Sequence, residues 1–130
     1  MASLVATHQF PNDQRAPGES RRFTRETLAG WGLGELSEVA ELLVSEMVTN
    51  AVGHAASGGA VVMCRTDSGI RVEVSDSGAG EVRPRSAEPL DVGGRGMAIV
   101  ATLSSRWGVT TESADGAAAK TVWFELDDGA

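Results

Sequence analysis

Three short segments of the sequence combine polar side chains and glycines in patterns that could bind or transform a ligand. The first segment is SEMVTNAVGHA (residues 45–55), which places Glu46, Asn50 and His54 at four-residue intervals. In an α-helix, with about 100° per residue, these side chains stack along one side, at the margin of the apolar stripe. A carboxylate, an amide and an imidazole there must be hydrogen-bonded or must face a cavity, because unpaired burial costs about 1–3 kcal/mol each.

Two other interpretations of this segment stay open on these residues alone. One is a polar seam whose members hydrogen-bond among themselves. The other is a metal site made of Glu46 and His54, but further ligands are scarce: the chain has no H-E-x-x-H motif, and its only other histidine is His8.

The second segment is IRVEVSDSGAG (residues 70–80), which begins as a strand with one apolar face. Asp76 continues the apolar register, so its carboxylate is expected to point toward the buried side and to need a hydrogen-bonding partner. Gly78 and Gly80 follow, and glycines let the backbone pass close to a ligand. The plainer alternative is a strand that ends in a glycine-containing turn with an exposed Asp.

The third segment is DVGGRGMAIV (residues 91–100), where glycines 93, 94 and 96 precede or open a helix. Free backbone amides at a helix N-terminus form a natural anion site, although a flexible helix entry would explain the glycines equally well. A loop with Arg83 and Arg85 separates this segment from the second and is expected to be mobile. Together the three segments indicate a nucleotide pocket, with a carboxylate for the base, amides for the phosphates, and Asn and Glu for a magnesium ion and its water.

The elements that must position these segments can be read from the hydrophobic pattern. A strand is expected at 4–10, a helix from Pro17 to the glycines at 30–34, and a long helix from about 35 to 56. Leu36, Ala40, Leu43, Met47 and Ala51 form the inward stripe of that long helix, with Glu35, Glu38, Glu41, Ser45 and Thr49 on the solvent side. Two strands flank a hairpin turn at 67–69, a helix covers 95–105, and strands at 106–113 and 120–127 close the chain. This order predicts one domain over residues 1–130, with a polar tail from about 127, built as an α/β (α+β) two-layer sandwich with helices on one face of the sheet.

Composition excludes several classes of function. The 130 residues carry 18 acidic and 11 basic side chains, a net charge of −7, which disfavours nucleic acid and anionic membrane as partners. No apolar run is long enough to cross a membrane and no signal segment is evident, so a cytoplasmic location is expected. Lys120 is the only lysine and lies outside any glycine-rich stretch, which excludes a P-loop. The single cysteine, Cys64, excludes an internal disulfide, and its apolar neighbours predict a buried core thiol.

The three segments resemble the boxes of the GHKL ATPase superfamily, which includes DNA gyrase, heat-shock chaperones, mismatch-repair ATPases and histidine kinases. SEMVTNAVGHA is similar to the N-box, DSGAG to the D-x-G-x-G box, and GGRGMAIV to the second glycine box. The spacing is closest to the small anti-sigma factor serine/threonine kinases and their actinobacterial relatives. RRFTRETLAGWGL and KTVWFEL also resemble that group, so the resemblance covers nearly the whole chain.

This resemblance implies the Bergerat ATP-binding fold, a mixed, mostly antiparallel sheet layered with helices, with ATP and Mg²⁺ as cofactors. Asn50 would coordinate Mg²⁺, Glu46 would be the catalytic base, and Asp76 would accept the adenine amino group. The remaining positions implied to bind nucleotide are His54 in the pocket wall, Gly78 and Gly80 beside the adenine, and Gly94, Arg95, Gly96 and Met97 at the lid hinge. The family often has a Gly-Thr pair before the last strand, where this chain has Ala119-Lys120, with Thr121 one residue further on. The usual threonine contact near the adenine is therefore in doubt.

As a kinase of this type, the protein would phosphorylate a serine or threonine on an anti-anti-sigma partner of the STAS type. It would regulate transcription by holding a sigma factor, without touching nucleic acid itself, and a homodimer remains compatible with this interpretation. The alternative is a non-catalytic regulatory module of the same fold, in which ATP only sets the shape of a partner surface. Both keep all three boxes, so the sequence does not separate them.

Overall fold

The fold is an antiparallel sheet with three helices, seen in a computed structural model that describes residues 4–54, 58–76, 92–114 and 117–128. The strands are β1 (Val5–Phe10), β2 (Gly59–Arg65), β3 (Gly69–Asp76), β4 (Arg106–Ala114) and β5 (Ala117–Asp127). The helices are α1 (Ala16–Gly30), α2 (Ser37–His54), which follows a one-turn 3₁₀ helix (Gly34–Leu36), and α3 (Val92–Leu103). The strand order in the sheet is β1-β2-β3-β5-β4.

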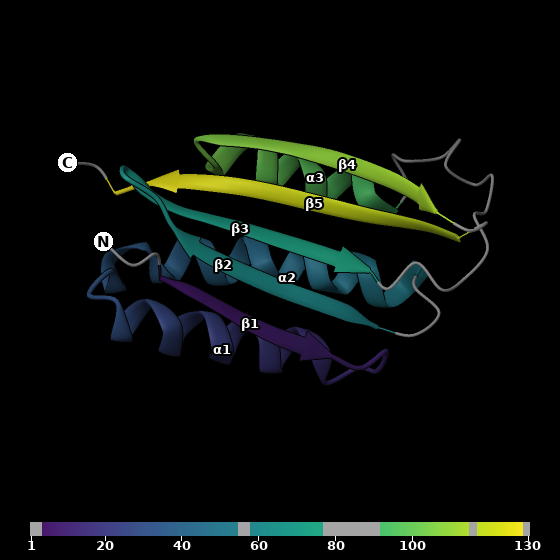
Figure 1. Cartoon of the computed structure of the whole chain (residues 1–130), viewed down its shortest axis with the longest axis horizontal. Helices are drawn as coiled ribbons and strands as arrows, with labels where there is room; N and C mark the ends of the chain where they lie inside the picture. Colours follow the sequence, from purple (N-terminus) through teal and green to yellow (C-terminus); the bar gives the residue numbers. More distant parts are fainter. Residues whose placement is uncertain (1–3, 55–57, 77–91, 115–116, 129–130) are drawn as a thin grey trace.

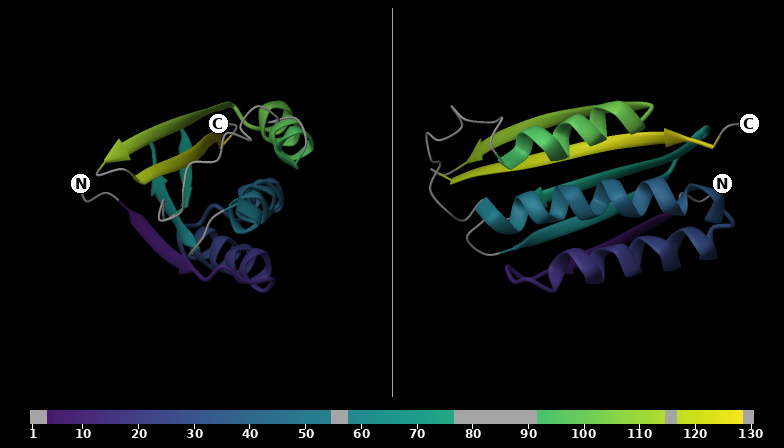
Figure 2. Two further views of the ribbon diagram at one scale, coloured as in Figure 1. Left: turned by 90° about the vertical axis from the view of Figure 1, so that its right-hand side faces the viewer. Right: turned by 180° about the vertical axis from the view of Figure 1, so that it is seen from behind.

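The described helices all lie on one face of this sheet, and no described helix or strand covers the other face, which is called the open face below (Figures 1 and 2). The predicted two-layer architecture is therefore confirmed. Every strand pair in the described part of the chain is antiparallel, so the mixed sheet that the family resemblance implied is not seen there. The strand order departs from the chain order at one point, because β5 lies between β3 and β4. The last described strand therefore lies beside β3, the strand that carries Asp76.

Alternation along the central strands determines which side chains fill the space between sheet and helices. In β3 the side chains of Ile70, Val72 and Val74 are buried, whereas the residues between them are half-buried on the open face. Phe124 of β5 pairs in register with Val72 and is fully buried. The helices cover this apolar layer, and none of the described ones is both long enough and apolar enough to cross a membrane.

The phase of α2 follows the predicted stripe closely. Leu43 is fully buried, whereas its neighbour Leu42 keeps 41% of its surface exposed. The predicted solvent side needs a correction, because α1 packs along part of it. Ser45 accepts a hydrogen bond from Arg21 at 2.8 Å, and Arg25 pairs with Glu41 at 3.0 Å, so these two α2 side chains are half-buried at the helix–helix contact.

The predicted hairpin between β2 and β3 is present, and its turn is Thr66–Ser68, one residue earlier than the predicted 67–69. The Gly69 N–H donates to Thr66 Oγ1 at 2.9 Å, and the Thr66 N–H donates back to the Gly69 carbonyl at 2.9 Å. Gly69 has a structural reason to be glycine: a Cβ there would lie 1.9 Å from the backbone oxygen of Leu126 on β5. The close approach of these two strands leaves no room for a side chain at this position.

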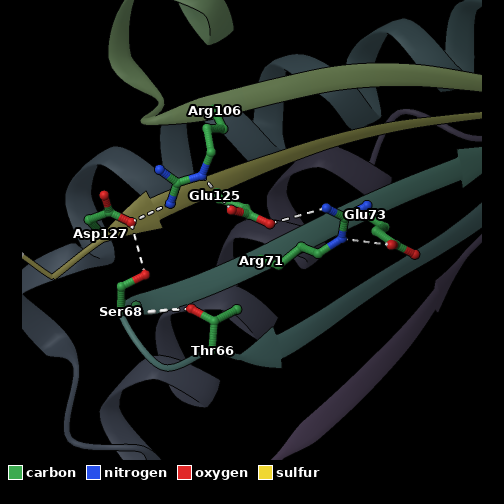
Figure 3. A network of polar contacts seen from close by, with 8 residues as sticks. Thr66, Ser68, Arg71, Glu73, Arg106, Glu125 and Asp127 are labelled. Carbon is green, nitrogen blue, oxygen red and sulfur yellow. Dashed lines mark hydrogen bonds and ion pairs between the residues drawn. The ribbon is translucent and has the colours of Figure 1, made fainter.

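The open face of the sheet carries a network of ion pairs across β3, β5 and β4 (Figure 3). Glu125 accepts hydrogen bonds from Arg106 at 2.6 Å and from Arg71 at 3.2 Å. Arg71 also pairs with Glu73 at 3.0 Å, and its guanidinium lies 4.1 Å from the ring centre of Trp123. The hydrogen bond from Arg106 is the main cause that lowers the pKa of Glu125 below its ordinary value of 4.5. This network stabilises the three strands on the side away from the helices.

The prediction of a core thiol at Cys64 is wrong. In β2 the alternation buries Val61 and Met63 under the helices, so Cys64 falls on the open face, opposite Arg71, and is half-buried. An unbroken apolar run contains residues of both faces, and only the pairing with β3 decides which of them point inward.

Candidate functional site at one end of the sheet

The structure brings parts of the three sequence segments to the same end of the sheet. Gly59, the first residue of β2, pairs with Asp76, the last residue of β3, so the end of α2 lies near the end of β3. At the opposite end, the Ser105 N–H that follows α3 donates to the Glu125 carbonyl at 2.8 Å. α3 has 12 residues and spans about 18 Å, and Figure 2 shows it lying along β4 and β5, so its N-terminus lies back toward the Asp76 end. In Figure 1 this end of the sheet is on the right, where α2 and β3 end and α3 begins.

Asp76, which the sequence analysis identified as a candidate site residue, lies at this end of the sheet. The alternation of β3 carries it onto the helix-covered side, where it is half-buried. Its Oδ1 accepts a hydrogen bond from the backbone N–H of Lys120 on β5 at 3.2 Å. A backbone donor on a paired strand holds this carboxylate in place, and a carboxylate can accept further hydrogen bonds through its remaining lone pairs.

Glu46 and Asn50 lie on one flank of α2 and are both half-buried. With 3.6 residues per turn, this flank points away from Glu41 and Ser45, which contact α1. The other helical neighbour of α2 is α3, so the two side chains border the space between α2 and α3. His54 is the last residue of α2, and its side chain lies outside the described part of the structure.

The glycine cluster forms the first turn of α3 rather than a segment before it. The sequence predicts a helix over 95–105, whereas α3 begins at Val92 and ends at Leu103. Gly93 and Gly94 therefore lie where a helix has backbone N–H groups without intrahelical acceptors, which favours an anion, whereas Gly96 is the fifth residue of α3 and lies past this first turn. The side chains of Arg95 and Met97 lie outside the described residues, as do Gly78, Gly80, Arg83 and Arg85 entirely, so their predicted contacts stay predictions.

The donor set fits a magnesium ion carried by a nucleotide better than a metal held by protein alone. Within the described ranges, no group of three His, Cys, Asp or Glu side chains could hold a metal ion. His8 is stacked on Phe23, with the two ring centres 5.2 Å apart, at the contact of β1 with α1. Mg²⁺ bound with phosphates needs only one or two protein oxygen ligands. The half-buried amide of Asn50 can supply one such ligand.

Sequence reasoning used Lys120 to exclude a P-loop and noted it as a departure from a family pattern, but missed its contact with Asp76. The signal was present in the spacing: Lys120 is two residues from Val122 and four from the buried Phe124, so it shares their face of β5. What the sequence did not show is that β5, rather than β4, pairs with β3.

Comparison with known proteins identifies the family of this chain. The family model described as "Histidine kinase-like ATPase domain" matches residues 10–124, which covers α2, β3 and α3 together with the core strands. No curated protein matches the chain. The match spans well over half of the sequence and agrees with the observed fold. The chain therefore belongs to the family of histidine kinase-like ATPase domains, within the GHKL superfamily.

Proposed function

We propose that this protein binds ATP with Mg²⁺ and transfers the γ-phosphoryl group to a serine or threonine of an anti-anti-sigma protein of the STAS type. In this function it also holds a sigma factor, and phosphorylation of the partner decides whether the sigma factor is released. The observation that carries the proposal is the meeting of α2, the end of β3 and the start of α3 at one end of the sheet. Family membership supports the nucleotide, and the spacing of the boxes supports the kinase class.

Each of the three elements supplies one part of nucleotide binding. Asp76 accepts the 6-amino group of adenine, because its carboxylate is held on the helix-covered side by Lys120. The N-terminal amides of α3 receive the phosphates. Asn50 is the protein ligand of the magnesium ion, which would neutralise charge that develops on the transferred group.

Glu46 is the general base in this proposal. It lies one helical turn before Asn50 on the same flank of α2, and Cβ atoms four residues apart on a helix are about 6 Å apart. A substrate hydroxyl group that is hydrogen-bonded to Glu46 would therefore lie close to the ATP phosphates, because Asn50 would bind the magnesium ion that these phosphates carry. In the transfer, the hydroxyl oxygen forms a bond to the γ-phosphorus, the bond to ADP breaks, and the hydroxyl proton passes to the Glu46 carboxylate.

The test compares Glu46→Gln with Asn50→Ala. Glu46→Gln keeps the size of the side chain and removes the proton acceptor, so we expect ATP binding to persist while transfer falls about 10²–10⁴-fold. Asn50→Ala should lose both binding and transfer. Glu38→Gln is the matched control, because Glu38 is exposed in the first turn of the same helix.

The measurement is transfer of labelled phosphate from ATP to candidate STAS-type proteins, with affinity measured separately by calorimetry. Transfer by Glu46→Gln at the parent rate would contradict the role of base. If the parent protein binds ATP and phosphorylates none of these partners, the kinase proposal fails. A nucleotide-dependent binding module of the same fold then explains the site better.

A further inference from the structure

The only lysine of the chain lies beside the carboxylate that is proposed to read the base. The backbone N–H of Lys120 donates to Asp76 Oδ1 at 3.2 Å, one residue beyond the last β3–β5 pair, Ser75 and Thr121. This contact uses only the backbone of Lys120, and the proposed function assigns no role to the Lys120 side chain. The inference below rests on that function, specifically on adenine binding at Asp76.

The register of β5 indicates where the Lys120 side chain lies. Phe124 is fully buried under the helices, and Val122 packs against the same core. Lys120 continues this alternation, so it belongs to the helix-covered face, at the end where α3 begins. Its side chain is nevertheless exposed. An exposed side chain on the inner face at the end of the sheet lies at the margin of the candidate site rather than in the core.

We propose that Lys120 is a specificity-determining residue whose ammonium group donates a hydrogen bond to N1 of the adenine that Asp76 holds. Adenine presents a donor, its 6-amino group, next to an acceptor, N1. Asp76 can only accept and a lysine ammonium can only donate, so together they match this edge. The two residues are already joined through the backbone contact, which places the flexible lysine stem within reach of a base bound at Asp76.

The same geometry favours the base over the phosphates as the target of Lys120. In a nucleotide the phosphates are separated from the base by the ribose, whereas N1 is bonded to the carbon that carries the 6-amino group. Lys120 is hydrogen-bonded to Asp76, which is proposed to accept the 6-amino group. Lys120 is therefore closer to N1 than to the phosphates. The start of α3 supplies separate donors for the phosphates.

The experiment measures the affinity of the parent protein and two variants for ATP and for 1-deaza-ATP, in which CH replaces N1. The test variant is Lys120→Met, which keeps the stem and removes the donor. The control is Arg65→Met, which removes one exposed positive charge at the opposite end of the sheet, where Arg65 pairs with Ile70. Thermal unfolding confirms that both variants fold.

We expect the parent protein to bind 1-deaza-ATP about tenfold more weakly than ATP, the range of a hydrogen bond from a charged donor. Lys120→Met should bind both nucleotides equally and at the weaker affinity, and Arg65→Met should behave like the parent. A Lys120→Met variant that still distinguishes the two nucleotides overturns the inference, because another group is then the donor. Equal weakening of both nucleotides by Lys120→Met overturns it in favour of a phosphate contact.

The result for the parent protein separates this inference from the proposed function. If the parent binds neither nucleotide, the proposed function fails and takes the inference with it. If the parent binds ATP and 1-deaza-ATP with the same affinity, nucleotide binding stands and only the assignment of Lys120 is overturned.

Discussion

Replacing Asp76 by Asn tests the adenine contact with little disturbance of the fold. The Lys120 N–H, which donates to Asp76 Oδ1 at 3.2 Å, can donate equally well to the amide oxygen of Asn. If the amide takes this orientation, its NH₂ group occupies the place of the second carboxylate oxygen. The NH₂ group would then face the 6-amino group of adenine, and two donors cannot hydrogen-bond to each other.

The magnitude follows from the burial of this side chain. A hydrogen bond to a charged group contributes about 1.5–3 kcal/mol, and loss of one partner exposes the other to its desolvation cost. Because Asp76 is half-buried, solvent moderates the effect, and we expect about 1.5–2 kcal/mol, or roughly 10–30-fold weaker ATP binding. GTP has a 6-oxo group, which cannot donate to Asp76, so the parent protein should bind it more weakly than ATP.

Calorimetry with ATP and GTP measures both effects, and thermal unfolding shows whether the strand contact survives. The control is Asp67→Asn, which removes one negative charge from an exposed residue in the hairpin turn at the far end of β3. If a folded Asp76→Asn variant binds ATP within about twofold of the parent, Asp76 does not read the base. The same conclusion follows if the parent binds ATP and GTP equally.

Three further predictions concern the frame that holds the site. Leu43→Ala should lower the free energy of unfolding by about 2–5 kcal/mol, because Leu43 is fully buried. Leu42→Ala should lower it by less than about 1 kcal/mol, because Leu42 is exposed. Equal values for the two variants in urea unfolding would contradict the orientation of α2. Gly69→Ala should lower the free energy of unfolding by about 3 kcal/mol, because its Cβ would meet a backbone oxygen of β5. A Cβ at Gly34 meets nothing within 4 Å, so Gly34→Ala should be tolerated. A Gly69→Ala variant as stable as the parent protein would refute the close approach of the two strands. Glu125→Gln should lower the melting temperature at pH 7 by about 2–5 °C. The folded-state pKa of Glu125 lies below its ordinary value of 4.5, so the stabilisation is present above that pH and is lost as the pH falls through the folded pKa; a difference between parent and variant that stays constant down to pH 3 would refute the ion-pair network.

Much of this protein could be predicted from local patterns, because the physics behind them is local. The hydrophobic period distinguishes α2 from β3, the turn residues at 67–69 mark the hairpin, and the alternation of β3 continues to Asp76. The order of these elements was sufficient for the two-layer class. The sequence also grouped the nucleotide-site candidates, because a polar helix margin, an inward-facing Asp and a glycine-rich helix start occur together in one short chain.

Only the tertiary structure decided how distant segments meet. The pairing of β5 with β3 brings Lys120 to Asp76 across 44 residues of chain, and no local pattern encodes which strand inserts beside which. For the same reason the sequence misjudged Cys64, because a fully apolar strand does not reveal its inner face until its partner sets the register. It also misjudged Glu41 and Ser45, because a polar helix face is open to water only until another helix with complementary arginines packs against it. Side-chain periodicity is a property of one segment, whereas register and helix packing depend on contacts between segments, and these form only in the folded chain.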